Sequence, residues 1–90
     1  MRHKLKSWPQ CFDPIVNGDR RHDLRRNDRN FQAGDMLELH EFDPSRKVYT
    51  GRQFEVEVTD ITSNDRPCAV SEKALTDGFC ILSIRPVDKS

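Results

Sequence analysis

The sequence has few apolar residues, no net charge and too few cysteines for a disulfide framework. Apolar residues make up 34% of the 90 positions, and 15 lysines and arginines balance 15 aspartates and glutamates. The three cysteines, Cys11, Cys68 and Cys80, form no CxxC pair, and the three histidines show no ligand spacing. This argues against a zinc site and a disulfide-stapled secreted domain. We expect reduced, partly buried thiols, no metal and no cofactor.

No part of the chain approaches the ~20 consecutive apolar residues that a membrane-spanning helix needs. The basic residues at the start are not followed by an apolar segment, so we expect no secretory signal. The sequence therefore predicts a cytoplasmic protein that does not enter a membrane. Ninety residues allow one domain with a small core, which we place at residues 1–86, followed by a frayed tail at 87–90. The sequence does not fix the oligomeric state, and we expect a monomer.

The neutral total hides an uneven distribution of charge. Residues 1–30 contain eight basic and four acidic side chains, whereas residues 31–90 contain seven basic and eleven acidic ones. Between Gly18 and Arg29, twelve residues include five arginines, three aspartates and one histidine. A core does not need this density of charge, so a function is expected here. A locally positive face suits an anionic partner such as a phosphate or a nucleic acid.

Short segments of alternating polar and apolar residues predict a mainly β fold. Within the second segment, the period places Leu24 toward the core and Asp23 and Arg25 on the opposite face. Several short strands in so short a chain favour a small barrel. The expected strands are residues 3–8, 22–26, 36–42, 54–61 and 79–84, with an arm at 47–51 that is either regular or irregular.

One helix is predicted between the first two strands, because Phe12, Ile15 and Val16 follow helical spacing. Pro14 lacks the N–H that a helix interior needs. The helix is therefore either short or begins near Cys11, so that Pro14 falls in its first turn. The overall expectation is a mainly β (α+β) barrel of about five to six strands, with one or two short helices.

The segment Gly18-x-Arg20-x-x-Asp23-x-Arg25 resembles the G-x-K-x-x-E-x-R signature of ASCH domains, which belong to the PUA-like superfamily. The wider pattern resembles the DUF3850 subgroup of small uncharacterised bacterial and phage proteins. The resemblance implies a PUA-like β-barrel with a cleft formed by the helix and the signature strand. It also implies a role connected with RNA. The residues that carry the wider pattern are His3–Lys6, Phe12, Gly18, Arg25–Phe31, Gly34, Asp35 and Tyr49–Arg52.

Some ASCH proteins are nucleases or amidohydrolases that act on acylated cytidines. In the amidohydrolases, a lysine two residues after the signature glycine and a threonine five residues after it are implicated in catalysis. The matching positions here hold Arg20 and Asp23. Arginine stays protonated and cannot act as a base, and an aspartate has no hydroxyl nucleophile. These departures favour binding over catalysis.

We predict that Arg20, Asp23 and Arg25 lie in one cleft and bind RNA or a nucleotide-like ligand. Two guanidinium groups can hold a phosphate bidentately, and the carboxylate can orient one of them. Tyr49 and Trp8 offer faces on which a base could stack. The predicted nucleic-acid-binding residues are Lys4, Lys6, Arg20, Asp23, Arg25, Arg26, Arg29 and Tyr49.

Three other interpretations stay open. Asp23 and Arg25 could be a structural ion pair at the bend between helix and strand. The chain could be a hydrolase or ribonuclease that acts on RNA or a modified nucleoside, with Asp23 or His22 as the acid–base group. It could also be a protein–protein adaptor of a phage or mobile element, using an exposed barrel edge at residues 52–61.

Overall fold

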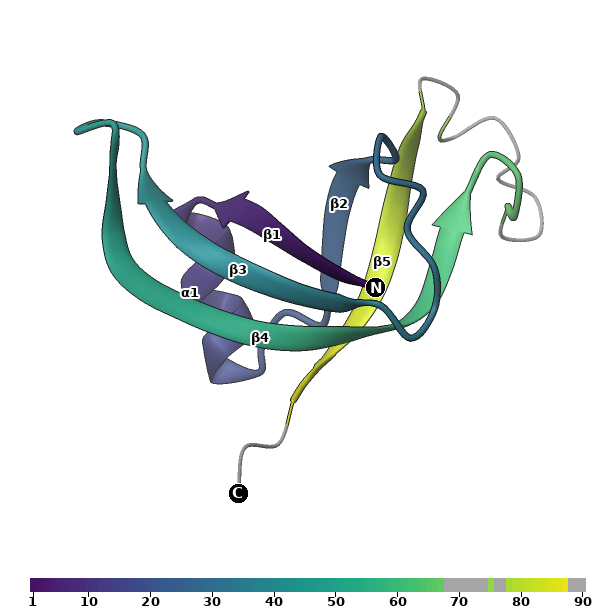
Figure 1. The fold of residues 1–90 in the computed structure, drawn as a ribbon, viewed down its shortest axis with the longest axis horizontal. Coiled ribbons are helices and arrows are strands. Elements are labelled where there is room, and N and C mark those ends of the chain that lie inside the picture. Colours follow the sequence, from purple (N-terminus) through teal and green to yellow (C-terminus); the bar gives the residue numbers. More distant parts are fainter. Residues whose placement is uncertain (68–74, 76–77, 88–90) are drawn as a thin grey trace.

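Five β-strands curl into a half-barrel in the computed structural model, which describes residues 1–67, 75 and 78–87 (Figure 1). One sheet contains all five strands, in the order β1-β3-β4-β5-β2. β1 and β3 are parallel, and the other neighbouring strands are antiparallel. The predicted mainly β class with a short helix is confirmed. The elements are β1 (Arg2–Ser7), α1 (Pro9–Asn17), β2 (His22–Arg26), β3 (Met36–Asp43), β4 (Val48–Ser63) and β5 (Phe79–Pro86).

The long strand β4 connects the two halves of the curled sheet. It has 16 residues and pairs with β3 over its first part and with β5 over its second. The arm and the strand that the sequence predicted separately are one strand, in which Gly51 adopts a φ of 92°. Residues 52–61 are therefore not the exposed edge expected for an adaptor. The edges of the sheet are β1 and β2.

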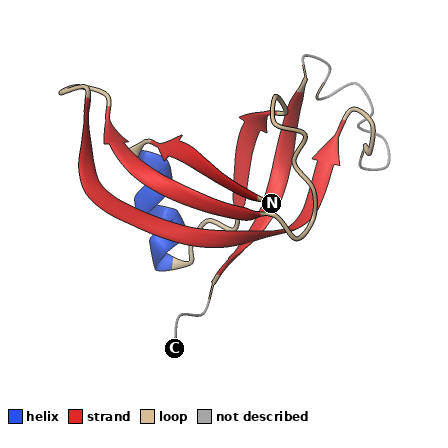
Figure 2. Ribbon diagram, viewed as in Figure 1, coloured by secondary structure: helices blue, strands red, loops and turns tan. Residues whose placement is uncertain are grey.

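The core lies between the inner face of the sheet and α1, which covers that face (Figure 2). Alternate residues of β3, β4 and β5 point into it, as the two-residue period of a strand requires. Burying each large aliphatic side chain stabilises the fold by roughly 1.5–3 kcal/mol. The most buried residues of the core are Phe12, Ile15, Leu37, Leu39, Val56, Val58, Cys80 and Leu82.

Of the two alternatives predicted for the helix, the short helix is the one found. α1 does not begin near Cys11. Its first residue is Pro9, so Pro14 lies inside it. The end is fixed by a pair of main-chain hydrogen bonds, from Gly18 to the Ile15 carbonyl at 3.2 Å and from Asp19 to the Pro14 carbonyl at 2.9 Å. Gly18 has a φ of 84°, the left-handed conformation that glycine adopts readily at a helix end.

The strand β2 has the predicted limits, but the side chain expected to face the core is exposed, and those expected on the opposite face are buried or partly buried. Leu24 is 53% exposed, whereas Asp23 is 6% exposed. The pairing with β5 sets this orientation, because Asp23 lies opposite the buried Leu82 and Arg25 opposite the buried Cys80. The expectation that Leu24 faces the core was wrong. Partners for the two charged groups, described below, outweigh the apolar preference of one leucine.

Several smaller expectations concern the ends and the cysteines. Cys80 is buried and Cys11 is half-buried, both as free thiols, and burial raises the pKa of the Cys80 thiol. Cys68 and residues 88–90 lie outside the described residues, while the Val87 N–H donates to the Glu55 carbonyl at 3.1 Å. In the described part of the chain, no helix is long and apolar enough to cross a membrane.

Candidate binding groove

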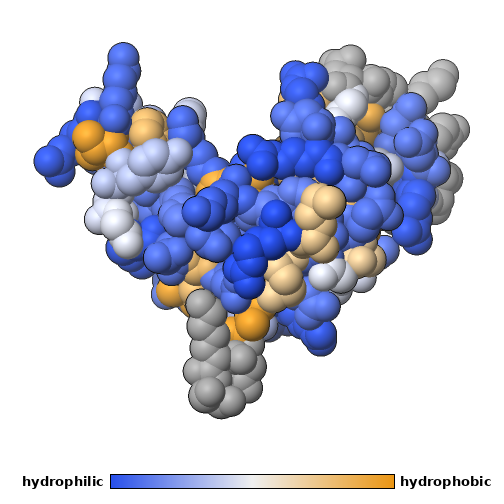
Figure 3. Space-filling view, in the orientation of Figure 1, coloured by the Kyte–Doolittle hydropathy of each residue, from blue (hydrophilic) through white to orange (hydrophobic). Residues whose placement is uncertain are grey.

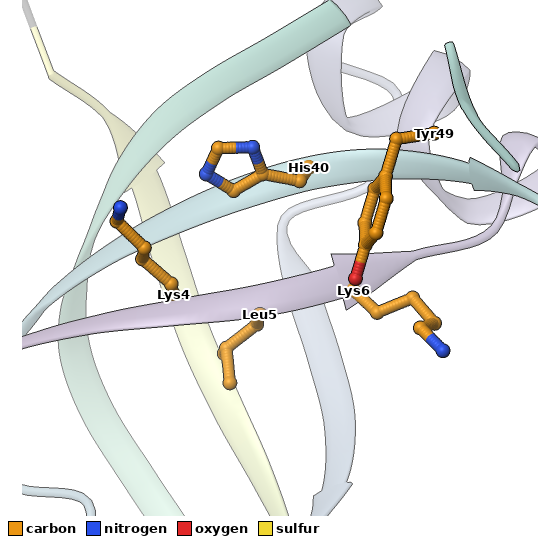
Figure 4. A pocket seen from close by; sticks show the side chains of 5 residues that line it. All are labelled: Lys4, Leu5, Lys6, His40 and Tyr49. Atoms are coloured by element: carbon orange, nitrogen blue, oxygen red, sulfur yellow. The ribbon is translucent and has the colours of Figure 1, made fainter. Parts of the chain in front are cut away.

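Two adjoining pockets form a groove along β1. The first has a volume of about 220 Å³ and contains side chains from β1, β3 and β4 (Figure 4). The second, of about 330 Å³, lies between β1, β2 and the following loop. Both are lined by Leu5 and Lys6, so they meet at β1. Figure 3 shows the molecule hollowed between the β3–β4 hairpin and the β2–β5 side.

We call these two pockets together the β1 groove. The first pocket is lined by Lys4, Leu5, Lys6, His40 and Tyr49. The second is lined by Leu5, Lys6, Leu24, Arg25, Arg26, Asp28, Arg29, Phe31 and Phe79.

The charged lining of the β1 groove is almost all basic. Five of its residues are lysines or arginines and one, Asp28, is acidic. Two of the cations lie over aromatic rings, with Lys6 Nζ 4.1 Å from the centre of Phe42 and the Arg26 guanidinium 4.7 Å from the centre of Phe79. Such contacts fix the position of a cation without neutralising it. The groove is therefore a concave, positively charged surface.

Arg25 closes the open side of the half-barrel. Its Nε donates to Asp23 Oδ2 at 2.6 Å on the same strand, and its Nη2 donates to the main-chain carbonyl of Lys6 at 2.7 Å. The Asp23 side chain is 8% exposed and that of Arg25 is 20% exposed. The ion pair considered from the sequence is therefore present. It lies within β2 and not at the bend after the helix. The separate hydrogen bond from Arg25 to the Lys6 carbonyl is the one that connects the two edge strands.

Arg20 is not brought together with Arg25. It lines a different pocket at the end of α1, and its Nε donates to the carbonyl of His22 at 3.3 Å. The helix end explains this position, because the Arg20 N–H also donates to the Pro14 carbonyl at 3.0 Å. The single cleft predicted for Arg20, Asp23 and Arg25 is thus divided between two places.

Tyr49 is the aromatic side chain best placed for stacking. It is 58% exposed and lies edge-on to Phe42 and His40, with ring centres 5.1 and 6.4 Å apart. These neighbours restrict its ring while leaving much of the side chain accessible. Trp8, the other aromatic residue considered, is 48% exposed at the start of α1 and does not line the β1 groove.

Sequence reasoning missed His40, which lines the groove beside Lys4 and Lys6. The His40 Nε2 and Glu38 Oε1 atoms are 2.8 Å apart. This hydrogen bond lowers the pKa of Glu38, burial opposes the effect, and Arg2 and Lys4 add to it. The parallel pairing of β1 and β3 places Lys6 opposite His40. Alternation along one strand does not reveal which strand will lie beside it.

The loop after β2 is fixed by one side-chain and one main-chain hydrogen bond of Asn27. Asn27 Oδ1 accepts a hydrogen bond from the Phe31 N–H at 3.1 Å, and the Asn27 N–H donates to the Gly78 carbonyl at 2.7 Å. Phe31 is buried in the core, which anchors one end of the loop. The loop thereby holds Asp28 and Arg29 on the rim of the groove.

Comparisons with known proteins give a family and a fold. The family model "Domain of unknown function (DUF3850)" matches residues 2–84. A phage relative, "Uncharacterized 12.9 kDa protein in GpA 3'region" of Escherichia phage P2, is 40% identical over 60 residues, which are 67% of this chain and 53% of that protein. The chain thus spans about half the length of that relative.

The fold is similar to that of a solved structure, "Crystal structure of hypothetical protein PH0355". The TM-score is 0.63 at 14% identity, and the match covers 97% of this chain and 100% of the other. At that identity the likeness shows the fold alone.

Proposed function

The chain belongs to the DUF3850 family, and we propose that it binds single-stranded RNA or a nucleotide-like ligand in the β1 groove. The observation that carries the proposal is the composition of that groove. Five basic residues and one acidic residue line two pockets that share Leu5 and Lys6, and the exposed Tyr49 lines the first of them. Phosphates need cations and bases need flat apolar faces, and this groove offers both.

Lys4 and Arg29 supply the charge that is most available to a phosphate. Among the residues that the structure describes, neither forms an ion pair with a carboxylate. They line different pockets of the groove, Lys4 the first pocket from β1 and Arg29 the second from the loop after β2. A strand of phosphates that follows the groove can contact both, and also Lys6, which lines both pockets.

The signature residues also support the proposal that the chain binds RNA or a nucleotide-like ligand. Gly18, Arg20, Asp23 and Arg25 match the ASCH pattern in the manner described above. We propose on this basis that the chain is an ASCH-type domain of the PUA-like superfamily, members of which commonly bind RNA or modified bases. Of the signature side chains, Arg25 is the one that faces the groove.

Fluorescence anisotropy with a labelled single-stranded RNA of mixed sequence tests the proposal. We expect saturable binding that weakens steeply as salt is raised. The double substitution K4Q/R29Q should reduce affinity, because it removes two unpaired cations from the groove. Arg46 and Lys47, exposed between β3 and β4 and outside both pockets, provide the matched double control R46Q/K47Q. Equal loss of affinity in the control and the groove variant would refute the assignment to the groove.

Cleavage of RNA is a second candidate function, and it depends on His40. The hydrogen bond to Glu38 orients the imidazole at the wall of the first pocket, as a general base requires. His40 would take the proton of a ribose 2′-OH, whose oxygen attacks the phosphorus and displaces the 5′-oxygen of the next nucleotide. That oxygen takes a proton from solvent, leaving a 2′,3′-cyclic phosphate and a 5′-hydroxyl.

His40 is a better candidate for this role than Asp23, which is buried and paired with Arg25. Incubation of the RNA with the wild type and with H40Q, analysed for cyclic phosphate ends, tests the idea. Cleavage by the wild type and its loss in H40Q support it. No cleavage by the wild type, or equal cleavage by both proteins, excludes His40 as a catalytic base.

A further inference from the structure

A further pocket, of about 310 Å³, lies at the C-terminal end of α1 and shares no lining residue with the β1 groove. We propose that it binds a small organic anion, with an apolar chain or ring on its floor and a carboxylate or phosphate beside its arginines. We call it the α1 pocket. It is lined by Ile15, Gly18, Arg20, Arg21, Val56, Ile84, Arg85 and Pro86.

The floor of the α1 pocket is apolar. Ile15, Val56 and Ile84 belong to the hydrophobic core and are 2%, 0% and 5% exposed. They come from α1, β4 and β5, so the floor is built on three packed elements and not on a loop. Because these three side chains are almost fully buried, the apolar surface open to a ligand is mainly that of the exposed Pro86 and of the arginine stems above the floor. An apolar group that covers this surface is transferred out of water and gains favourable contact. Inorganic anions cannot use this surface.

The rim of the α1 pocket is cationic, and two of its three guanidinium groups are not neutralised. Arg85 donates from Nε and Nη2 to Glu57 Oε1 at 3.0 and 2.7 Å, so its charge is balanced. Arg20 donates from Nε to a neutral carbonyl, that of His22. Within the described residues, neither Arg20 nor Arg21 forms an ion pair. Two guanidinium groups side by side in the chain suit a carboxylate or phosphate, which they can bind bidentately.

The helix end next to the pocket opposes an anion, because a helix carries partial negative charge at its C-terminus. This effect is reduced here, since the last carbonyls are already occupied. Ile15 accepts from Gly18 at 3.2 Å, and Pro14 accepts from Asp19 and Arg20 at 2.9 and 3.0 Å. The two uncompensated guanidinium charges therefore dominate the rim.

The arrangement favours an amphiphilic anion over an RNA strand. The bases of RNA can also cover an apolar surface, but a strand carries a phosphate with every base, whereas the α1 pocket places two uncompensated cations beside one small apolar surface. A short aliphatic or aromatic oxyanion satisfies both parts of the pocket. The α1 pocket therefore has a ligand class different from that proposed for the β1 groove, and the two proposals stand independently.

Amide chemical shifts of the full ¹⁵N-labelled chain test this proposal with hexanoate and hexyl phosphate as probes. Acetate and inorganic phosphate provide the charge alone, and 1-hexanol provides the chain alone. We expect saturable shifts at Gly18, Arg20, Arg21 and Ile84 for at least one of the two probes. Each control compound should bind at least about tenfold more weakly than that probe. Equal binding of acetate and hexanoate, or shifts at no residue of the pocket, would overturn the proposal.

A pair of variants assigns the contact. R20Q/R21Q should weaken binding of the probe about tenfold, because the oxyanion loses both uncompensated cations. R46Q, an exposed arginine outside both sites, should leave it unchanged. An unchanged amide spectrum elsewhere shows that the variants are folded. Unchanged binding in R20Q/R21Q would also overturn the proposal, whatever the outcome of the RNA titrations.

Discussion

The guanidinium of Arg25 donates a hydrogen bond of 2.7 Å to the main-chain carbonyl of Lys6. The bond connects β2 to β1, the two edge strands of a sheet whose other neighbours are paired by main-chain ladders. The same guanidinium holds Asp23 at 2.6 Å. Hydrogen bonds with an ionised partner are stronger than neutral ones. One side chain therefore closes the half-barrel and presents positive charge to the groove.

The substitution R25A should destabilise the protein, because it removes both bonds and leaves the buried Asp23 carboxylate unpaired. We expect the free energy of unfolding in urea to fall by about 1–3 kcal/mol. The double variant D23A/R25A provides the control and should lose less than the sum of the two single losses. Additive losses would mean that the two side chains are not coupled.

Replacement of Tyr49 separates stacking from hydrogen bonding. Y49A should weaken RNA binding by about 1–3 kcal/mol, the usual contribution of one stacked base. Y49F keeps the ring and should bind nearly as well as the wild type. W8A removes an exposed aromatic residue outside the groove. If W8A weakens binding as much as Y49A, Tyr49 is not the stacking residue.

Arg29 should act through charge alone. We expect R29A to weaken RNA binding to a similar extent for every sequence tested and to reduce the slope of log K against log salt by about 0.7–1. The measurement is a series of anisotropy titrations at four salt concentrations. A slope that stays at the wild-type value would show that Arg29 makes no phosphate contact.

The lowered pKa of Asp35 predicts that the protein loses stability in acid. Burial raises the pKa of its carboxyl, but hydrogen bonds from His3, the Gln32 N–H and the Met1 amino group lower it, and the net pKa lies below the ordinary value. Its contribution is therefore complete above the pKa of the unfolded chain, ~3.9, and is lost as pH falls through the lower folded pKa.

Urea unfolding of the wild type and of D35N between pH 2 and pH 6 measures this contribution. D35N should be less stable than the wild type at pH 6, and the difference should shrink as the pH falls toward 2. A difference that does not change with pH would show that ionised Asp35 does not stabilise the fold.

The strand positions were readable from the sequence because polar and apolar residues alternate along β1 and β3, and because β5 begins with an apolar run from Phe79 to Leu82 and ends at Pro86. The orientation of β2 was not readable. Its only apolar residue, Leu24, suggested the wrong face. The strand period places Asp23 and Arg25 together, but the pairing with β5 and the Lys6 carbonyl that accepts from Arg25 come from distant parts of the chain. Buried charge with good partners reverses the usual pattern.

The residues of the candidate site were only partly readable from the sequence. Basic residues on β1 and after β2 could be identified, and the structure brings Lys4, Lys6, Arg25 and Arg29 around one groove. Arg20 could not be placed, because two main-chain bonds at the end of α1 determine its direction. His40 was missed because strand pairing between distant segments leaves no local signal. Tertiary contacts therefore decide which charges share a surface.

Amide chemical shifts of the ¹⁵N-labelled chain, recorded during titration with a short single-stranded RNA, test the central claim most directly. The account predicts saturable shifts at residues 4–6, 25, 26, 28, 29 and 49, which line the β1 groove, and their suppression at high salt. Shifts that are absent, scattered over the surface, or confined to residues 18–21 of the α1 pocket would contradict it.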